Sequence, residues 1–254
     1  MDTLLSVSHV SYSYHTLSGE TPALSDITFS VKEGEFLSIV GPSGCGKSTL
    51  LSLLASLMEP ESGTIVLRGK PLAPHTANIG YMLQKDHLFE WRTVYRNIVL
   101  GLEIQKKMTS EYLHHVDQLM EAYGLWAFRN SRPSELSGGM RQRCALIRTL
   151  ASDPEILLLD EPFSALDYQT RLAVSADIWR IIRQEGKTAL LVTHDIAEAV
   201  SMSDRVVVLS ARPAVVKTVL DMGALRGLPP LERRSTAEFH RYFDLIWKEL
   251  DVHG

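Results

Sequence analysis

The sequence predicts an α/β fold whose central sheet is mainly parallel. An apolar segment at residues 35–40 runs into a glycine-rich loop and then into a helical pattern at residues 48–57. Residues 156–159 are all apolar, as expected for a strand that is buried on both faces of a parallel sheet. From about residue 153 onward, strand and helix patterns alternate, which is typical of such sheets.

The first part of the chain predicts a smaller antiparallel β portion beside this core. Apolar and polar residues alternate at positions 5–10 and 26–31, and residues 62–69 form a third candidate strand with turn residues at each end. Residues from about 85 to 135 instead carry helical patterns, such as the one at 111–123. They predict a helical insertion.

The glycine-rich loop matches a phosphate-binding pattern, G-x-x-x-x-G-K-[ST], at every fixed position. Glycines let several backbone N–H groups point at one anion, and the following helix adds the positive potential of its N-terminus. Lys47 can reach the outer phosphates of a nucleotide, and Ser48 can place its hydroxyl on Mg²⁺. The alternative is a glycine turn before a buried helix, which the complete pattern between strand and helix disfavours. The predicted nucleotide contacts are Gly41, Pro42, Ser43, Gly44, Cys45, Gly46, Lys47, Ser48 and Thr49.

Two carboxylates, Asp160 and Glu161, end the apolar run at 156–159. Ligands bind at the carboxyl ends of strands in open α/β sheets. Asp160 is therefore predicted to hold Mg²⁺ through water, and Glu161 to polarise the water that attacks the γ-phosphate. Alone, an Asp-Glu pair after a strand is usually a solvated turn. Together with the phosphate loop it is the expected second half of an NTPase site.

A second glycine motif lies at residues 136–142. Residues 133–136 are predicted to form a loop and residues 140–150 a helix, so Ser137, Gly138 and Gly139 lie at a helix N-terminus, where anions bind. One chain does not need two phosphate cradles for one nucleotide, but a two-fold dimer does if each chain completes its partner's site. An ordinary glycine-containing helix start is the alternative that periodicity alone leaves open.

Taken together, these segments resemble the ATP-binding subunit of ABC transporters over nearly the whole chain. The matching segments follow the order of that family: the phosphate loop at 41–48, Gln84, the signature at 136–142, Asp160-Glu161, the segment 164–167 and His194. The resemblance implies the ABC ATPase fold, with ATP, Mg²⁺ and ATP hydrolysis. Met140 stands where the most common signature has Gln. Because this position lies inside the helix start and is not a phosphate donor, we expect activity to survive.

The resemblance also implies a division of the chain, which we treat as a single ABC ATPase domain, 1–254. Residues 1–84 and 153–210 are expected to form the nucleotide-binding core with the antiparallel β subdomain. Residues 85–152 are expected to form the helical subdomain that carries the signature, and residues 211–254 a short C-terminal extension.

By the same resemblance, Ser137, Gly138 and Gly139 contact the γ-phosphate that is bound by the opposite chain of an ATP-sandwich homodimer. Asp167 links the two sites across that dimer.

Further roles are implied within each chain. Gln84 touches Mg²⁺ and the attacking water and senses the membrane partner, and His194 contacts the γ-phosphate and holds the active geometry. Tyr14 corresponds to the aromatic residue that stacks on adenine in this family. Tyr12 has the same strand parity and stays an alternative.

The region after Gln84, residues 85–98, resembles the nitrate, taurine and aliphatic sulfonate importer branch. That branch also includes transporters of pyrimidine vitamin precursors. Two departures are Glu90, where Pro is usual, and Ser164, where Gly is usual. The implied partners are integral membrane permease subunits and, indirectly, a solute-binding protein, which together recognise the solute.

Two other functions remain open at this stage: an exporter subunit of a lipid or lipoprotein system, and a soluble ABC ATPase acting on DNA or ribosomes. Proteins of the second kind usually carry two nucleotide domains or a long coiled coil, and this chain carries neither. The formal net charge of −4 also argues against nucleic-acid binding.

The resemblance implies a peripheral subunit at the cytoplasmic face of the cell membrane, and the composition agrees with it. The two cysteines, Cys45 and Cys144, do not form a disulfide framework and fit a reducing compartment. No apolar run approaches the roughly 20 residues that span a bilayer, and the first residues lack a signal pattern.

The C-terminal segment contains one more helical pattern, at residues 236–250, which we expect to pack on the domain. Arg226, Arg233 and Arg234 precede it and are expected to lie on solvated faces.

Overall fold

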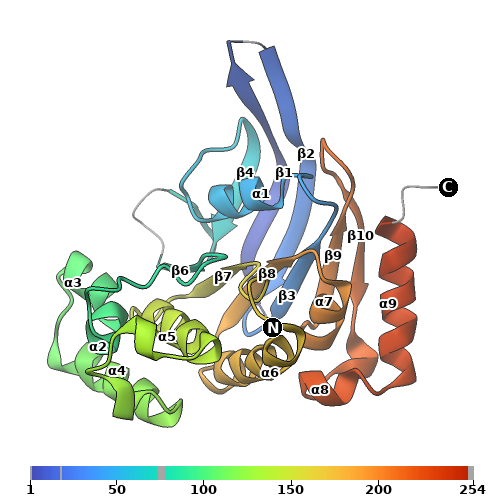
Figure 1. Ribbon diagram of the computed structural model, residues 1–254. Coiled ribbons are helices and arrows are strands. Elements are labelled where there is room, and N and C mark those ends of the chain that lie inside the picture. Colours follow the sequence, from blue (N-terminus) through green and yellow to red (C-terminus); the bar gives the residue numbers. More distant parts are fainter. Residues whose placement is uncertain (1, 18, 74–77, 251–254) are drawn as a thin grey trace.

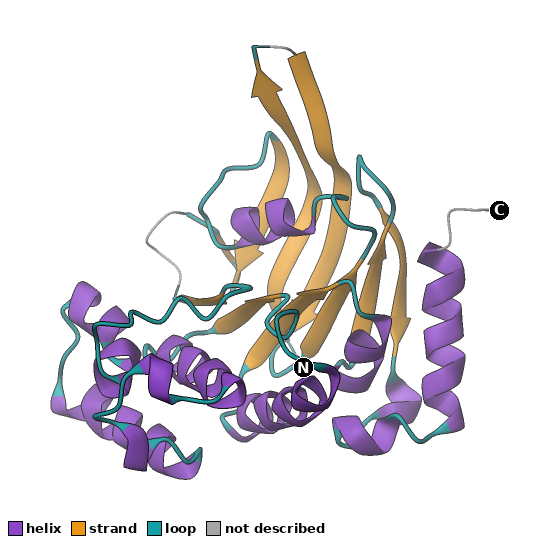
Figure 2. Cartoon of the chain, viewed as in Figure 1, coloured by secondary structure: helices purple, strands orange, loops and turns teal. Residues whose placement is uncertain are grey.

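The computed structural model describes residues 2–17, 19–73 and 78–250, which form two sheets and the helices that pack on them (Figures 1 and 2). One sheet is four-stranded and antiparallel, and the other is six-stranded. The predicted α/β class with a mainly parallel central sheet and an antiparallel β portion is therefore confirmed.

The antiparallel sheet is built around a long hairpin, which rises at the top of Figure 1. The sequence predicts only the inner parts of its two 14-residue strands, because the alternation of buried and exposed residues fades where the hairpin leaves the core. In spatial order the strands are β2 (Gly19–Lys32), β1 (Thr3–Thr16), β4 (Ser62–Leu67) and β5 (Lys70–Pro71).

The larger sheet has five parallel strands and one antiparallel edge strand, β10. Its central strands are buried on both faces, as the apolar runs predict. In spatial order the strands are β10 (Val216–Asp221), β9 (Arg205–Leu209), β3 (Phe36–Val40), β8 (Thr188–Thr193), β7 (Ile156–Asp160) and β6 (Ile79–Met82).

Helix α1 (Lys47–Leu54) lies between the two sheets, and other helices cover the opposite face of the parallel sheet. Strand β7 shows why both of its faces are apolar. Ile156 and Leu158 pack in the core around α1, whereas Leu157 and Leu159 pack in the core beneath the other helices. The phosphate-binding segment is thus held by a helix that is buried from two sides.

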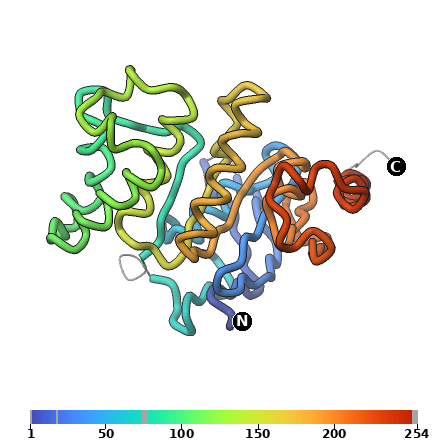
Figure 3. The backbone as a smooth tube through the Cα atoms, turned by 90° about the horizontal axis from the view of Figure 1, so that it is seen from below, coloured from blue at the N-terminus to red at the C-terminus, as the bar shows by residue number. Residues whose placement is uncertain are grey.

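The second layer of helices includes α5 (Gly138–Leu150), α6 (Tyr168–Gln184) and α7 (Ile196–Met202). Helix α5 begins two residues earlier than the expected residue 140. The helical insertion precedes α5 in the chain and forms a lobe with it, seen from below in Figure 3 beside α6. Its other elements are α2 (Val94–Ile98), α3 (Leu100–Gln105), α4 (Ser110–Ala122) and the 3-10 turns η1 (Trp126–Phe128) and η2 (Pro133–Glu135).

The C-terminal segment packs against the β10 side of the molecule, as expected. It contains η3 (Gly223–Leu225), α8 (Pro230–Arg233) and α9 (Ala237–Leu250). Phe239 and Ile246 of α9 join a cluster with strand β9 and helix α7, while Trp247 on the outer face is exposed. The division of the chain into core, helical subdomain and extension stays a prediction.

The expectation for Arg233 is wrong. Its side chain is completely buried, and its guanidinium donates to the carbonyls of Leu228, Val200 and Ser203. Those carbonyls lie at the ends of α7 and of the turn before α8, where backbone acceptors lack helical partners. An arginine that caps such carbonyls is stabilised inside the protein, and a sequence pattern does not reveal it. Arg226, by contrast, is exposed.

None of the helices in the described ranges is both long enough and apolar enough to cross a membrane.

Candidate functional site

The phosphate-binding loop joins the carboxyl end of β3 to the start of α1, as the sequence predicts. Two of its glycines have left-handed backbones, Gly44 with φ +75° and Gly46 with φ +120°. At Gly46 a Cβ atom would also lie 2.9 Å from Leu24 and 3.0 Å from the carbonyl oxygen of Ala23. Only glycine therefore allows the loop to curl this closely over strand β2.

Lys47 occupies the centre of the loop. Its Nζ donates to the carbonyl oxygens of Gly41 at 2.8 Å and Pro42 at 3.0 Å. The side chain is only 6% exposed, whereas Ser43, Gly44 and Ser48 face solvent. The loop thus combines exposed residues with a cation held by its own carbonyls, and a polyphosphate needs both backbone donors and a cation.

Cys45 points inward from the loop and is buried, and burial raises the pKa of its thiol. It contributes packing and a backbone N–H. Its side chain therefore lacks the thiolate character of a reactive cysteine.

Asp160 lies at the carboxyl end of β7, next to the loop. Burial is the main cause that raises the pKa of its carboxyl, and the neighbouring Glu161 adds to the effect, while the hydroxyl of Tyr81 and the charge of Lys47 act against it. Tyr81 donates to Asp160 Oδ2 at 3.3 Å, and its own pKa is raised to about 12, chiefly by burial. The sequence interpretation missed Tyr81. Its place in the short strand before Gln84 was the available signal.

Glu161 has a left-handed backbone, with φ +43°, and its N–H donates to Val192 of the neighbouring strand. This conformation is uncommon for a residue with a Cβ, and such residues cluster at functional sites. Here it turns the carboxylate away from the strand toward two polar side chains.

Those two side chains are Gln84 and His194, both predicted from the sequence. Glu161 Oε2 lies 3.1 Å from His194 Nδ1 and 3.5 Å from Gln84 Nε2. Gln84 Nε2 also donates to the hydroxyl of Ser164 at 3.1 Å, and that hydroxyl donates to the carbonyl of Glu161. The fold therefore gathers a carboxylate, an imidazole and an amide from the ends of β6, β7 and β8.

Tyr14 lies above the first turn of α1, where its hydroxyl shares a 2.9 Å hydrogen bond with the hydroxyl of Thr49. Its ring is 39% exposed, and the guanidinium of Arg212 lies 5.9 Å from the ring centroid. Tyr12 instead packs against the core around α1. The two rings also contact each other edge to face at 5.2 Å, and Tyr14 is the more exposed of the two.

The second glycine motif begins α5. Ser137 caps the helix by accepting a hydrogen bond from the N–H of Met140. Gly138 and Gly139 lie close to α6 and the turn before it, so that an added Cβ would come within 3.2 Å of Leu166 and 2.9 Å of Val174, respectively. None of the hydrogen bonds or ion pairs between described residues joins this motif to the phosphate loop of its own chain.

Asp167 caps the next helix, α6, by accepting from the N–H of Thr170. A hydrogen bond with the side chain of Thr170, and secondly the one from its backbone N–H, lower the pKa of the Asp167 carboxyl. Its side chain is exposed beside the second glycine motif, which leaves it free to meet another molecule.

A network of ion pairs ties the segment after Gln84 to α5. Arg141 donates from two nitrogens to Asp86, at 2.8 Å and 3.1 Å, and from a third to Glu90 at 2.9 Å. Arg148, which lies further along α5, donates to the backbone carbonyls of Asp86 and His87. Glu90, the departure from the family pattern, thus has a partner within the chain.

Comparison with known proteins identifies the family and the fold of the chain. The model of the family described as ABC transporter matches residues 24–164. An uncharacterized ABC transporter ATP-binding protein of Bacillus subtilis, YtlC, is 44% identical over 98% of this chain and 96% of its own length.

Two further relatives have names that state a solute. The taurine import ATP-binding protein TauB of Jannaschia sp. is 40% identical over 77% of this chain and 73% of its own. The aliphatic sulfonates import ATP-binding protein SsuB of Bacillus cereus is 38% identical over 98% of this chain and 97% of its own.

Among solved structures, the ATP-binding cassette MJ0796, described as a dimer in a post-hydrolysis state bound to ADP and Pi, superposes with a TM-score of 0.72. It is 29% identical in sequence, and the match covers 86% of this chain and 99% of that one.

Proposed function

The chain belongs to the ABC transporter family, and we propose that it is the ATPase subunit of an importer of small organic anions. ATP binding and hydrolysis follow from the family. The convergence of Lys47, Asp160, Glu161, Gln84 and His194 on one edge of the sheet is the observation that carries a role for each residue. The names of the relatives TauB and SsuB support sulfonate-like solutes.

In this proposal, the phosphate loop and Lys47 bind the phosphates of ATP, and the ring of Tyr14 stacks on adenine. Ser48, Gln84 and Asp160 offer a hydroxyl, an amide oxygen and a carboxylate, which are the hard oxygen ligands that Mg²⁺ prefers. A bound Mg²⁺ would neutralise charge on the outer phosphates.

Glu161 is the proposed general base. It lies at the strand end, and its Oε2 atom is the shared partner of His194 and Gln84. His194 holds the carboxylate in place from one side, and Gln84 from the other. A carboxylate positioned in this way can orient a water molecule for attack on the γ-phosphate.

The second cradle, formed by Ser137, Gly138 and Gly139, is proposed to bind the γ-phosphate held by a second copy of the chain. It is exposed and lies at the N-terminus of a 13-residue helix. The dimeric state of the cassette MJ0796 supports this arrangement.

The permease is proposed to dock on the lobe that follows Gln84. There Trp91 is 70% exposed and packs against Phe89, and the ion pairs of Arg141 connect this segment to the signature helix. A displacement of this segment by the permease would therefore be transmitted through α5 to the second phosphate cradle. The chain would be located at the cytoplasmic face of the membrane as a peripheral subunit, with a solute-binding protein acting on the permease.

The first experiment substitutes Glu161→Gln, which keeps the shape of the side chain and removes its basicity. We expect nucleotide binding to persist, hydrolysis to fall by about 10²–10⁴-fold, and an ATP-bound dimer to accumulate in gel filtration. Glu155→Gln, at the opposite end of the same strand, is the matched control and should hydrolyse ATP normally. Near-normal turnover in Glu161→Gln would remove Glu161 from the catalytic role.

The transport assignment has its own test. Co-purification with an integral membrane protein, and stimulation of the ATPase by that permease together with a sulfonate-loaded binding protein, would support import. Stable association with ribosomes or DNA in the absence of a permease, or stimulation by a lipid substrate, would overturn it.

A further inference from the structure

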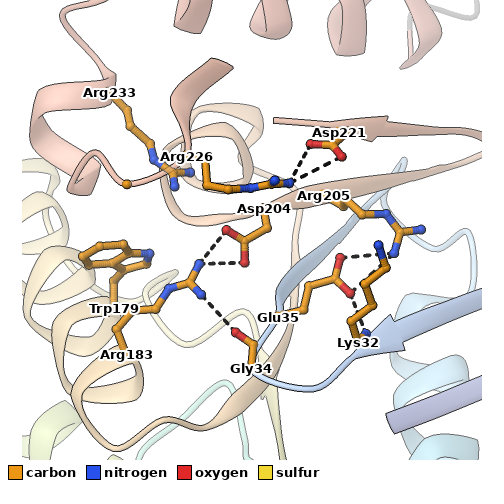
Figure 4. A pocket seen from close by; sticks show the side chains of 11 residues that line it. Lys32, Gly34, Glu35, Trp179, Arg183, Asp204, Arg205, Asp221, Arg226 and Arg233 are labelled. Carbon is orange, nitrogen blue, oxygen red and sulfur yellow. Dashed lines mark hydrogen bonds and ion pairs between the residues drawn. The ribbon is translucent and has the colours of Figure 1, made fainter. Parts of the chain in front are cut away.

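A cavity of about 440 Å³ lies away from the nucleotide site, at the ends of β3 and β9 where these strands begin (Figure 4). Glu35 precedes β3, Asp204 precedes β9, and Trp179 and Arg183 come from the last turns of α6. The volume lies in the range that small-molecule sites occupy.

The cavity carries an excess of positive charge. Its lining contains five cationic side chains, from Lys32, Arg183, Arg205, Arg226 and Arg233, but only three carboxylates. Two of the cations are compensated: Arg183 pairs with Asp204 at 2.7 Å, and Arg205 pairs with Glu35 at 3.1 Å (Figure 4).

The other three cations are not balanced in this way. Among the described residues, Arg233 makes no ion pair, although it is completely buried and burial lowers its pKa to about 10. Within the described ranges, Arg226 pairs only with Asp221, at 3.2 Å, and both side chains are more than 60% exposed, so water screens the pair. Lys32 is exposed at the rim, with no ion pair among the described residues.

The unmatched polar atoms in the same wall are also donors. The indole Nε1 of Trp179 and the Nε of Arg183 are buried and find no hydrogen-bond partner in the part of the chain that the structure describes. Buried donors without partners are costly and uncommon, and they call for an acceptor. Charge and hydrogen bonding therefore favour the same kind of ligand, an anion with several acceptor oxygens.

We propose that this cavity binds a small organic anion, with a sulfonate, carboxylate or phosphate group held by Arg226, Arg233 and the Trp179 indole. The volume exceeds that of an inorganic anion alone and leaves room for an organic group beside Trp179, whose ring is also approached by the Arg183 guanidinium at 5.5 Å. This site is independent of the proposed nucleotide site, because it shares no residue with the phosphate loop, Asp160 or Glu161.

Benzenesulfonate and inorganic sulfate are the probes, titrated calorimetrically into the full-length protein saturated with ADP so that the phosphate loop is filled. We expect one saturable site for benzenesulfonate and weaker binding of sulfate. Arg226→Ala should weaken benzenesulfonate binding about tenfold, the typical effect of losing a charge-assisted hydrogen bond.

Arg180→Ala is the matched control, because Arg180 is equally exposed, pairs with an exposed Asp at 3.1 Å and does not line the cavity. It should leave the affinity within about twofold of the unchanged protein. Trp179→Phe, which keeps a ring and removes the N–H, should also weaken binding.

Lys47→Ala separates the two anion sites and should bind benzenesulfonate normally. The proposal is overturned if neither probe saturates a site, if Lys47→Ala abolishes binding, or if Arg226→Ala and Arg180→Ala have equal effects.

Discussion

Glu198 lies in the first turn of α7, directly after the segment that carries His194, and is only 3% exposed. It accepts a 2.7 Å hydrogen bond from the hydroxyl of Thr193, and its N–H donates to Asp195. Burial is the main cause that raises the pKa of its carboxyl to about 7. No sequence motif singles it out, since an acidic residue in the first turn of a helix usually faces water.

This pKa predicts a particular dependence of stability on pH. Below the ordinary pKa of 4.5 the carboxyl is protonated in both states, and between 4.5 and about 7 the folded state binds more protons than the unfolded state. Stability is therefore lost as the pH rises through this window, by up to about 3 kcal/mol. Glu198→Gln should remove this loss of stability, because its side chain does not titrate. The difference in free energy of unfolding, variant minus unchanged protein, should therefore be larger at pH 8 than at pH 5. Urea unfolding of both proteins at both pH values measures these free energies.

The control is Glu238→Gln, an exposed acidic residue in the first turn of α9. It should show no such difference between the two pH values. If Glu198→Gln also shows none, the buried carboxyl is not held protonated.

At the scale of elements, two ion pairs join helix α5 to the segment after Gln84, and their side chains differ in exposure. Arg141 is 23% exposed and its partner Asp86 is 20% exposed, whereas Glu90 is 54% exposed. Partly buried charges that lose a partner cost more than exposed ones, because water cannot replace the lost contact.

Asp86→Asn should therefore lower the free energy of unfolding by about 1–2 kcal/mol, while Glu90→Gln should lower it by less than about 0.5 kcal/mol. Both values come from chemical denaturation at neutral pH. Equal effects of the two substitutions would show that burial does not decide the strength of this connection.

Elements with a strong local pattern could be predicted from the sequence, and those held by distant contacts could not. The strand before the phosphate loop and β7 are contiguous apolar runs, and α5 follows a clear cap. The edge strand β10 alternates between half-buried and exposed residues, with none fully buried, and is positioned by pairing with β9. The outer half of the β1–β2 hairpin has mostly exposed side chains, so it lacks the burial signal on which sequence patterns depend.

For the candidate site, the proximity of several motif residues could be predicted from the sequence, while their roles stay proposals. Its residues follow fixed motifs, and the structure brings Gln84, Glu161 and His194 together although they are far apart in sequence. Tyr81 and Arg212 were missed because each reaches the site from a neighbouring element, with no motif of its own. The burial of Arg233 depends on helix-end carbonyls from other segments, which a sequence alone does not bring together.

At the scale of the whole molecule, each chain carries one complete phosphate loop and one separate glycine cradle. If the cradle serves a second chain, two inactive variants should rescue each other when mixed. Lys47→Ala disables the loop, and Ser137→Arg blocks the cradle. A mixed dimer then contains one site with both defects and one site with neither.

An equal mixture should therefore recover about a quarter of the ATPase activity of the unchanged protein, since half of the dimers are mixed and each has one intact site of two. Each variant alone should be nearly inactive. An inactive mixture, with mixed dimers confirmed by differential tagging, would place both motifs in one chain's own site.

The two hydrogen bonds that Lys47 makes to its own loop also affect how fast the site can be emptied. If Lys47 binds the phosphates as proposed, a nucleotide that enters must break the contacts to Gly41 and Pro42 before it gains the lysine, so its affinity reflects an exchange of hydrogen bonds. When the products depart, the same carbonyls recapture the ammonium, so the leaving phosphate does not strand a buried cation. In the proposed site, the loop carbonyls would therefore compete with the nucleotide for Lys47, and we expect this competition to shorten the residence time of ADP.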